Sequence, residues 1–278
     1  MLTSFGADPN GGPKAQKTPL QVAAANGNLD SLKLLLDNNA IVDLNGPNNG
    51  SALFSAVLNC QSNAVRYLLD KNSMPDQVAL PRGGAKCKIS PMLALFDRDR
   101  SQRCEGSSLN TVISALVQGN ASFAVPAHDD CENQTAIMTA LESKQDISVV
   151  EHLLSLKADP NQAGRDGSGE LFKPFEYAFM QTSYLGAPLA EFSKIAKLLH
   201  SYKASVDATL DQAYTPLMMA AEYCESDLVK VLLGLNADPD KRNDDQKTAA
   251  DLACSNSEEN ATVAENLKTL LRSQGKRA

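Results

Sequence analysis

TPLMMAAEYCESDLVKVLLGLNADPD, residues 215–240, contains the pattern from which we predict the fold. It opens with Thr215-Pro216, which suits a helix start because the Thr hydroxyl can cap the first turn and the Pro nitrogen carries no unbonded hydrogen. Apolar residues then recur at helical spacing over 216–223 and over 227–235. The stretch ends at Asn236-Ala237-Asp238-Pro239, where Asn tolerates a left-handed backbone and Pro cannot continue a helix. It therefore predicts two short helices followed by a turn.

The opening of this stretch recurs along the chain. The openings stand at Thr18, Ser51, Ser90, Thr135, Lys173, Thr215 and Thr248, with spacings of 33, 39, 45, 38, 42 and 33 residues. Helix-ending signals and paired leucines recur between them, as at Lys157-Ala158-Asp159-Pro160 and Leu35-Leu36. A single pair of short helices cannot bury its apolar side alone, so we predict that the pairs stack on one another.

With these landmarks the sequence resembles the ankyrin-repeat family, whose unit reads approximately TPLHxAAxxGHxxxVxxLLxxGADxN. The resemblance implies an all-α ankyrin-repeat solenoid of stacked helix-turn-helix units joined by hairpin loops. About seven units are expected in a single domain over residues 1–278, opening near 18, 51, 90, 135, 173, 215 and 248. We interpret residues 1–17 as the end of a truncated preceding unit, because Gly6-Ala7-Asp8-Pro9 is a helix-ending signal with no opening before it.

The chain departs from the family pattern in two ways. The family's His after Thr-Pro-Leu is absent, which predicts the loss of a hydrogen bond between units; the replacements are Gln21, Phe54, Leu93, Met138, Glu176, Met218 and Asp251. Extra residues near 77–86 are expected to lengthen a hairpin, and those near 99–108 and 182–189 to form loops between two helices. Long loops on a rigid scaffold are frequent sites of function, but they also accumulate neutral change, and both interpretations stay open.

The resemblance also implies where a partner would bind. In ankyrin folds the first helix of each unit and the hairpin tips line a concave groove. Carried over to this chain, the partner-binding residues are Asn26, Asn59, Arg98, Glu142, Phe172, Tyr177, Met180, Tyr214, Met219, Glu222 and Tyr223. Tyr and Met suit an interface, since Tyr buries a large area with a polar end and Met adapts to irregular shapes. The alternative is that these are partly buried packing residues.

We expect a protein-protein interaction module that belongs to a longer signalling, scaffold or effector protein and binds a protein or peptide partner. The alternative is a substrate-targeting or regulatory segment of a multidomain enzyme whose catalytic part lies outside this chain; a third possibility is a structural spacer.

Catalytic residues, cofactors and a small-molecule substrate are not expected, because His128, His152 and His200 lie in no recognisable catalytic setting. No metal site is expected either, since His128-Asp129-Asp130-Cys131 lacks paired-ligand spacing with Cys87 or Cys104.

The composition narrows the function further. A formal net charge of -7 argues against nucleic-acid binding, which needs a concentrated basic face. No apolar run approaches the ~18 residues of a membrane span, so membrane insertion is not expected. Six cysteines are scattered too widely for a disulfide scaffold in a chain of 278 residues, which predicts reduced thiols and a cytoplasmic location.

Overall fold

A computed structural model describes residues 6–12, 16–45, 50–79, 88–96, 104, 106–124, 134–166, 168–183, 185–209, 213–255 and 261–275. Its contacts divide the chain into two compact parts. The N-terminal part comprises Met1–Ala158 and Ala163–Leu171, and the C-terminal part comprises Asp159–Gln162 and Phe172–Ala278. Each part is described by itself, and the single domain over residues 1–278 stays a prediction.

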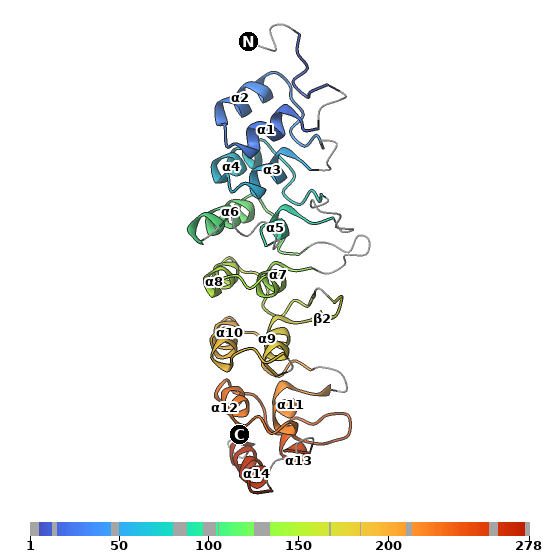
Figure 1. Cartoon of the computed structure of the whole chain (residues 1–278), viewed down its shortest axis with the longest axis vertical. Helices are drawn as coiled ribbons and strands as arrows, with labels where there is room; N and C mark the ends of the chain where they lie inside the picture. The colour runs from blue at the N-terminus through green and yellow to red at the C-terminus, as the bar shows by residue number, and fades with distance from the viewer. Residues whose placement is uncertain are drawn as a thin grey trace. The chain divides into compact units, whose positions relative to one another are not determined.

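Each of the seven predicted openings is followed directly by a helix. These first helices are α1 (Pro19–Ala25), α3 (Ala52–Leu58), α5 (Pro91–Ala94), α7 (Ala136–Glu142), α9 (Pro174–Ser183), α11 (Pro216–Glu222) and α13 (Ala249–Leu252). A second helix follows each one: α2 (Leu29–Asp37), α4 (Ser62–Asp70), α6 (Gly106–Gln118), α8 (Ile147–Ser155), α10 (Leu189–Ser201), α12 (Ser226–Gly234) and α14 (Ala261–Gly275). Figure 1 shows the two helices of a pair side by side, as in α11 with α12. The predicted helix pairs are confirmed.

Side-chain oxygens start most of the first helices, as the openings predict. In α1 the Thr18 hydroxyl accepts a hydrogen bond from the Gln21 N–H at 3.1 Å. Ser51, Ser90, Thr135, Thr215 and Thr248 cap their helices in the same way. Lys173 has no side-chain oxygen, and before α9 its own N–H instead donates to Glu176 Oε2 at 2.9 Å. The opening at Lys173 therefore lacks a capping hydroxyl but keeps the bond to the third helical residue that Thr18 N–H also makes with Gln21.

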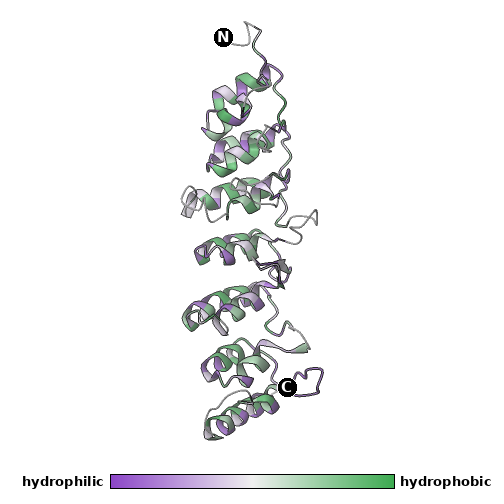
Figure 2. Ribbon diagram, turned by 45° about the vertical axis from the view of Figure 1, so that its right-hand side comes forward, coloured by the Kyte–Doolittle hydropathy of each residue, from purple (hydrophilic) through white to green (hydrophobic). Residues whose placement is uncertain are grey.

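Small and branched apolar residues form the core between successive repeats. In the N-terminal part α1 packs on α3, α3 on α5 and α5 on α7, while α2, α4, α6 and α8 form the parallel series of second helices. In the C-terminal part α9 packs on α11 and α11 on α13. Ala24 and Ala220 are fully buried, which lets first helices approach closely, and Leu32 and Leu232 are fully buried in second helices. Burying each Leu contributes about 1.5–3 kcal/mol. Figure 2 shows hydrophobic and hydrophilic stretches on the same helices, as expected for this packing.

The hairpins after the second helices are linked by Asn and Asp side chains. In the N-terminal part, Asn10 accepts from the Ile41 N–H at 2.8 Å, and Asp43 and Asp76 accept from the corresponding N–H groups of Met74 and Ser122. In the C-terminal part, Asn161 accepts from Ser205 N–H and Asp207 from Asp238 N–H. Ala124 occupies the same position after α6, and its methyl group cannot accept a hydrogen bond.

Short strand pairings close some of the hairpins. The base of the hairpin near 77–86 is closed by reciprocal backbone bonds between Ala79 and Ile89, at 3.0 and 2.9 Å. Residues 80–87 lie outside the described residues. Strands β1 (Gly164–Arg165) and β2 (Leu171–Phe172) form a two-stranded sheet. The prediction of a longer hairpin near 77–86 is thus supported at its base.

The loops predicted between helices are wrong in part, because several of the extra residues extend helices. Helices α9 and α10 have 10 and 13 residues, compared with 7 and 9 in α11 and α12. Thr182, Ser183 and Leu189 of the segment near 182–189 are helical. Gly106–Ser108 of the segment near 99–108 start α6, whereas 97–103 and 105 lie outside the described residues. An added turn of helix satisfies backbone groups that an irregular loop would leave to solvent.

The prediction of a lost hydrogen bond between units is wrong at Gln21. This side chain is 4% exposed, and its Nε2 donates to the carbonyl of Gly50, which precedes α3 of the next repeat. Its Oε1 accepts from the Thr18 N–H at 2.7 Å. An amide has both a donor and an acceptor, so it can link two repeats as well as cap its own helix.

The prediction of reduced thiols is wrong for the four cysteines that the structure describes. Cys60 is bonded to Cys104 in the N-terminal part, and Cys224 is bonded to Cys254 in the C-terminal part. Their Cα atoms are 5.5 and 4.6 Å apart. Separations of 44 and 30 residues in sequence become short distances because stacking brings neighbouring repeats together. Cys87 and Cys131 lie outside the described residues.

Candidate binding surface

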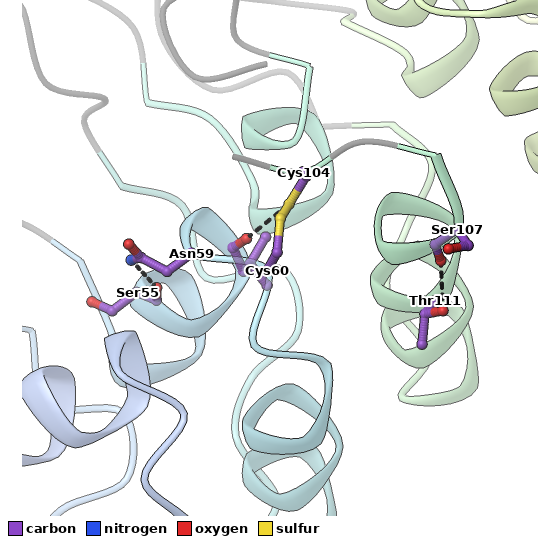
Figure 3. Close-up of a disulfide and its surroundings, with 7 residues drawn as sticks. Ser55, Asn59, Cys60, Cys104, Ser107 and Thr111 are labelled. Atoms are coloured by element: carbon purple, nitrogen blue, oxygen red, sulfur yellow. Dashed lines mark hydrogen bonds between the residues drawn. A yellow bond between two sulfur atoms is a disulfide. The ribbon is translucent and has the colours of Figure 1, made fainter. Parts of the chain in front are cut away.

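Five of the predicted partner-binding residues lie where first helices end, and one of them, Glu222, is the last residue of α11. Asn26, Asn59 and Tyr223 each follow the last residue of α1, α3 and α11, and Glu142 is the last residue of α7. Asn26 is exposed, Asn59 and Glu142 are half-buried, and Tyr223 is 41% exposed. The Asn59 amide donates to the Ser55 carbonyl at 2.8 Å, which fixes its orientation, as Figure 3 shows. Within each part, the ends of these helices thus carry accessible polar and aromatic side chains.

The C-terminal part brings three predicted residues together. Burial raises the pKa of the Tyr214 hydroxyl, and the negative charge of Glu222 raises it further. A hydrogen bond with Asn243 opposes this pKa shift, while the nearby Asp245 and Tyr223 add to it. Tyr214, Glu222 and Tyr223 therefore share one neighbourhood at the end of α11, where an exposed aromatic ring lies beside acidic groups. We call Tyr214, Glu222, Tyr223 and Asp245 the α11 patch.

The prediction that Tyr177 lies on the open surface is wrong. Tyr177 is 7% exposed, and its ring centroid is 6.3 Å from that of Phe172. Its low exposure and its contact with the Phe172 ring make it a packing residue, the alternative left open by the sequence. Phe172, Met180 and Met219 are half-buried and keep part of their surface accessible. Arg98 lies outside the described residues.

An acidic hairpin that was not predicted from the sequence carries one residue of the α11 patch, Asp245. Asp244 and Asp245 are exposed at the tip of this hairpin. Asn243 is 2% exposed and holds the tip, since its side chain accepts from the Lys247 N–H at 2.9 Å and its own N–H donates to the Lys247 carbonyl. The run Asn243-Asp244-Asp245-Gln246 is a turn signal that could have identified the tip. Only the structure shows that this tip lies near Tyr214.

A Ser-His contact in the N-terminal part does not have the geometry of a catalytic pair. Ser114 Oγ lies 2.8 Å from His152 Nε2, and the carbonyl oxygen of Asn110 lies 3.0 Å from the same nitrogen. A carbonyl only accepts, so Nε2 carries the proton that it donates to Asn110. A protonated Nε2 cannot take the proton of Ser114, as a general base must. The three groups join α6 to α8.

Other features of the described residues lie away from the predicted surface. An open hollow of about 460 Å³ lies at the ends of α4 and α6, lined by residues that include Arg66, Asp70, Met74 and Gln118. These side chains come from second helices and the hairpin after α4. Among the described residues no cluster of three metal-ligating side chains is found. In the same ranges, none of the helices is both long and apolar enough to span a bilayer.

Solved structures with a similar fold are ankyrin-repeat domains. The ankyrin repeat domain of Bcl-3, a member of the IkappaB protein family, has a TM-score of 0.61 at 20% identity and covers 92% of this chain and 100% of that one. The human ASB11 ankyrin repeat domain has a TM-score of 0.53 at 22% identity, with 92% and 98% covered. An ankyrin repeat domain from Acinetobacter baumannii AYE has a TM-score of 0.58 at 19% identity, with 79% and 98% covered. These similarities show the fold alone.

Sequence comparisons lead to the same family. Over 148 residues, which are 53% of this chain, the sequence is 26% identical to alpha-latrocrustotoxin-Lt1a of Latrodectus tredecimguttatus, and the match spans 9% of that protein's length. The profile described as ankyrin repeats (3 copies) matches residues 1–78 and 187–275, more than half of the chain. Ankyrin repeats are generally protein-protein interaction modules and are typically non-catalytic. On the repeated helix pairs and this profile match, the chain belongs to the ankyrin-repeat family.

Proposed function

We propose that this chain recognises a partner protein through the side chains at the ends of its first helices, with the α11 patch as the principal contact. The observation that supports the proposal is the exposed ring of Tyr223, 41% accessible, in the same neighbourhood as Tyr214 and Glu222. Tyr side chains are enriched among residues that dominate binding energies, because they bury a large area at a small cost in conformational entropy.

The charge of the α11 patch indicates the chemistry of the partner. Glu222 and Asp245 raise the pKa of Tyr214, so their negative charges act on the same small volume. Asp244 adds a third carboxylate at the exposed tip of the hairpin. An acidic surface with aromatic rings favours Lys or Arg side chains, whose charge is attracted to the carboxylates and to the ring faces. We therefore propose an extended or helical segment with basic residues as the partner.

We also propose that the chain acts as a part of a longer signalling, scaffold or effector protein. The similarity to alpha-latrocrustotoxin-Lt1a supports this, because a stretch resembling this chain occupies only 9% of that protein. A stack of repeats with hydrogen-bonded hairpins presents its helix ends in a fixed order. Such a surface can bind a partner without catalysing a reaction.

The proposal is tested by site-specific photo-crosslinking of the full chain in lysate. A photoreactive residue at position 223 is compared with one at position 34, because Leu34 on α2 is also exposed, at 51%, but lies on a second helix. We expect a crosslinked partner from position 223 and not from position 34. The crosslinked segment is then made as a peptide, and its Kd is measured by calorimetry.

Two substitutions with matched controls give the decisive measurement. Tyr223→Ala should weaken peptide binding about 10-fold or more, as expected for an aromatic contact residue. Glu222→Gln should weaken binding and reduce its salt dependence, whereas Glu191→Gln on the exposed side of α10 should change neither. If Tyr223→Ala and Glu222→Gln bind the peptide like the wild-type chain, the α11 patch is not the binding surface.

A further inference from the structure

The turn between the two helices of a repeat has an unusual backbone at one position. The second residue after the first helix has a positive φ in five repeats: Gly27 (65°), Cys60 (55°), Lys144 (54°), Cys224 (63°) and Cys254 (58°). Glycine adopts this left-handed conformation without penalty, whereas a side chain makes it unfavourable. Three cysteines therefore stand at a position where the backbone favours glycine.

These turns lie against the neighbouring repeat. A Cβ atom added at Gly27 would clash with the side-chain oxygen of Gln61, so the first and second repeats touch at this point. Cys224 and Cys254 occupy the turn position of two successive repeats, and their Cα atoms are 4.6 Å apart. Cys60 is joined to Cys104, which precedes α6 of the next repeat, across a Cα distance of 5.5 Å. Figure 3 shows this bond directly beside Asn59, at the end of α3.

Both bonds join neighbouring repeats at the place where the candidate binding residues lie. Asn59 is followed by Cys60, and Tyr223 by Cys224. Cys104 and Cys224 are buried, at 6% and 9% exposed, and their partners Cys60 and Cys254 are half-buried. A cross-link here holds the end of one first helix against the next repeat. It offsets the unfavourable backbone of the cysteines by restricting the unfolded chain.

We infer that the Cys60–Cys104 and Cys224–Cys254 bonds are staples between repeats, and that the array keeps its packing at these turns only while they are oxidised. The protein then acts where thiols are oxidised, outside the reducing cytosol. The cytoplasmic location was predicted from reduced thiols, and the two disulfide bonds remove that argument for it. Binding at the α11 patch should also depend on the Cys224–Cys254 bond, a consequence that rests on the function proposed above.

The chemical step that removes a staple is thiol-disulfide exchange with a dithiol reductant. One thiolate of the reductant attacks a cysteine sulfur, the S–S bond breaks, and a mixed disulfide forms. The second thiol of the reductant then closes its own disulfide and releases the remaining cysteine. The two cysteines gain two electrons and two protons, and the reductant loses them. Reduced Cys224 and Cys254 keep a left-handed backbone without the bond that offsets it.

The test uses the full chain without any partner, so its outcome is independent of the proposed binding. Protein oxidised in air is digested without reductant, and mass spectrometry is expected to find Cys60 linked to Cys104 and Cys224 to Cys254. Hydrogen exchange is then compared with and without dithiothreitol. We expect faster exchange in α11 to α14 after reduction. Exchange in α1 and α2, which contain no cysteine, serves as the internal control and should change least.

Paired variants separate the bond from the strain at the turn. The double variant with Cys224→Ser and Cys254→Ser should lower Tm by about 5–10 °C. The double variant with Cys224→Gly and Cys254→Gly should lower Tm by less, because glycine adopts the left-handed backbone without strain. In both variants dithiothreitol should no longer change exchange in α11 to α14. Absence of the linked peptides in the oxidised chain overturns the inference. Linked peptides whose reduction leaves both Tm and exchange unchanged overturn it as well.

Discussion

Helices α1 and α9 start the same kind of repeat in two parts of the chain, but they are held by different side chains. At α1, Thr18 caps the helix while Gln21 bonds both to Thr18 and to Gly50 of the next repeat. At α9, Lys173 replaces the cap, and Glu176 accepts from its N–H while 5% exposed. Both helices keep the bond from the N–H of the N-cap residue to the third helical residue, but α9 makes it with a buried carboxylate and lacks the capping hydroxyl.

The largest difference is expected when this third residue is removed. Gln21→Ala leaves the buried Thr18 N–H and Gly50 carbonyl without partners, which should destabilise the chain by about 2–4 kcal/mol. Glu176→Ala removes one hydrogen bond but also a buried charge, so its loss should be smaller. Urea unfolding followed by circular dichroism measures both. Equal losses at the two positions would show that the burial of the Glu176 carboxylate has no appreciable cost.

Substituting the residue at the N-cap position should change the stability less than removing the third helical residue does. Thr18→Ala should cost about 1 kcal/mol, the usual value of an N-cap oxygen. Lys173→Ala should change stability by less than about 0.5 kcal/mol, because the Lys side chain caps nothing. Lys173→Thr adds an oxygen at the cap position and should stabilise the chain. If Lys173→Thr lowers the stability instead, the backbone N–H groups in the first turn of α9 need no further acceptor beyond Glu176.

The smallest effect depends on pH. Desolvation raises the pKa of Glu176 above its usual value of 4.5, although the Lys173 N–H and charge oppose this rise. The ionised carboxylate is thus less favourable in the folded chain than in the unfolded chain, and wild-type stability should increase as pH falls from 7 through the folded pKa. Glu176→Gln keeps an acceptor for the Lys173 N–H without a charge, so it should gain up to about 1 kcal/mol at pH 7.

Unfolding of Glu176→Gln and of the wild-type chain is compared from pH 7 to pH 4. The advantage of the variant should shrink as pH falls and vanish below the unfolded pKa of about 4.5. Glu191→Gln, at an exposed position, is the matched control and should show no such trend. A gain for Glu176→Gln that is constant across this pH range would exclude desolvation as its cause.

The ends of the first helices differ between the two parts as well. The N-terminal part presents the amides of Asn26 and Asn59, whereas the C-terminal part presents Tyr223 beside Glu222. The backbone at these helix ends is alike, so the fold sets the position of a contact residue but not its chemistry. This is the reason for placing the principal contact at the α11 patch.

Local signals were enough to predict the helix pairs. Thr, Ser and Pro at the openings, together with left-handed residues such as Asn39, Asn120 and Asn236, start and end helices through contacts within a few residues. The resemblance assigned Asn26, Asn59 and Tyr223 to the first helices, and in the structure they directly follow α1, α3 and α11. It failed at α9 and α10, where the extra residues extend helices, and at Tyr177, which is buried.

The sequence by itself determined that this chain is an array of helix pairs, because capping, periodicity and helix-ending turns act over a few neighbouring residues. Only the tertiary structure decided which thiols pair, how Gln21 reaches Gly50, and that Glu222 and Asp245 lie near enough to raise the pKa of Tyr214. The bonds between cysteines and the bond from Gln21 to Gly50 join residues 29 to 44 positions apart, and stacking of one repeat on the next brings them together. Their distances depend on the packing of every residue between them, which local sequence patterns do not encode.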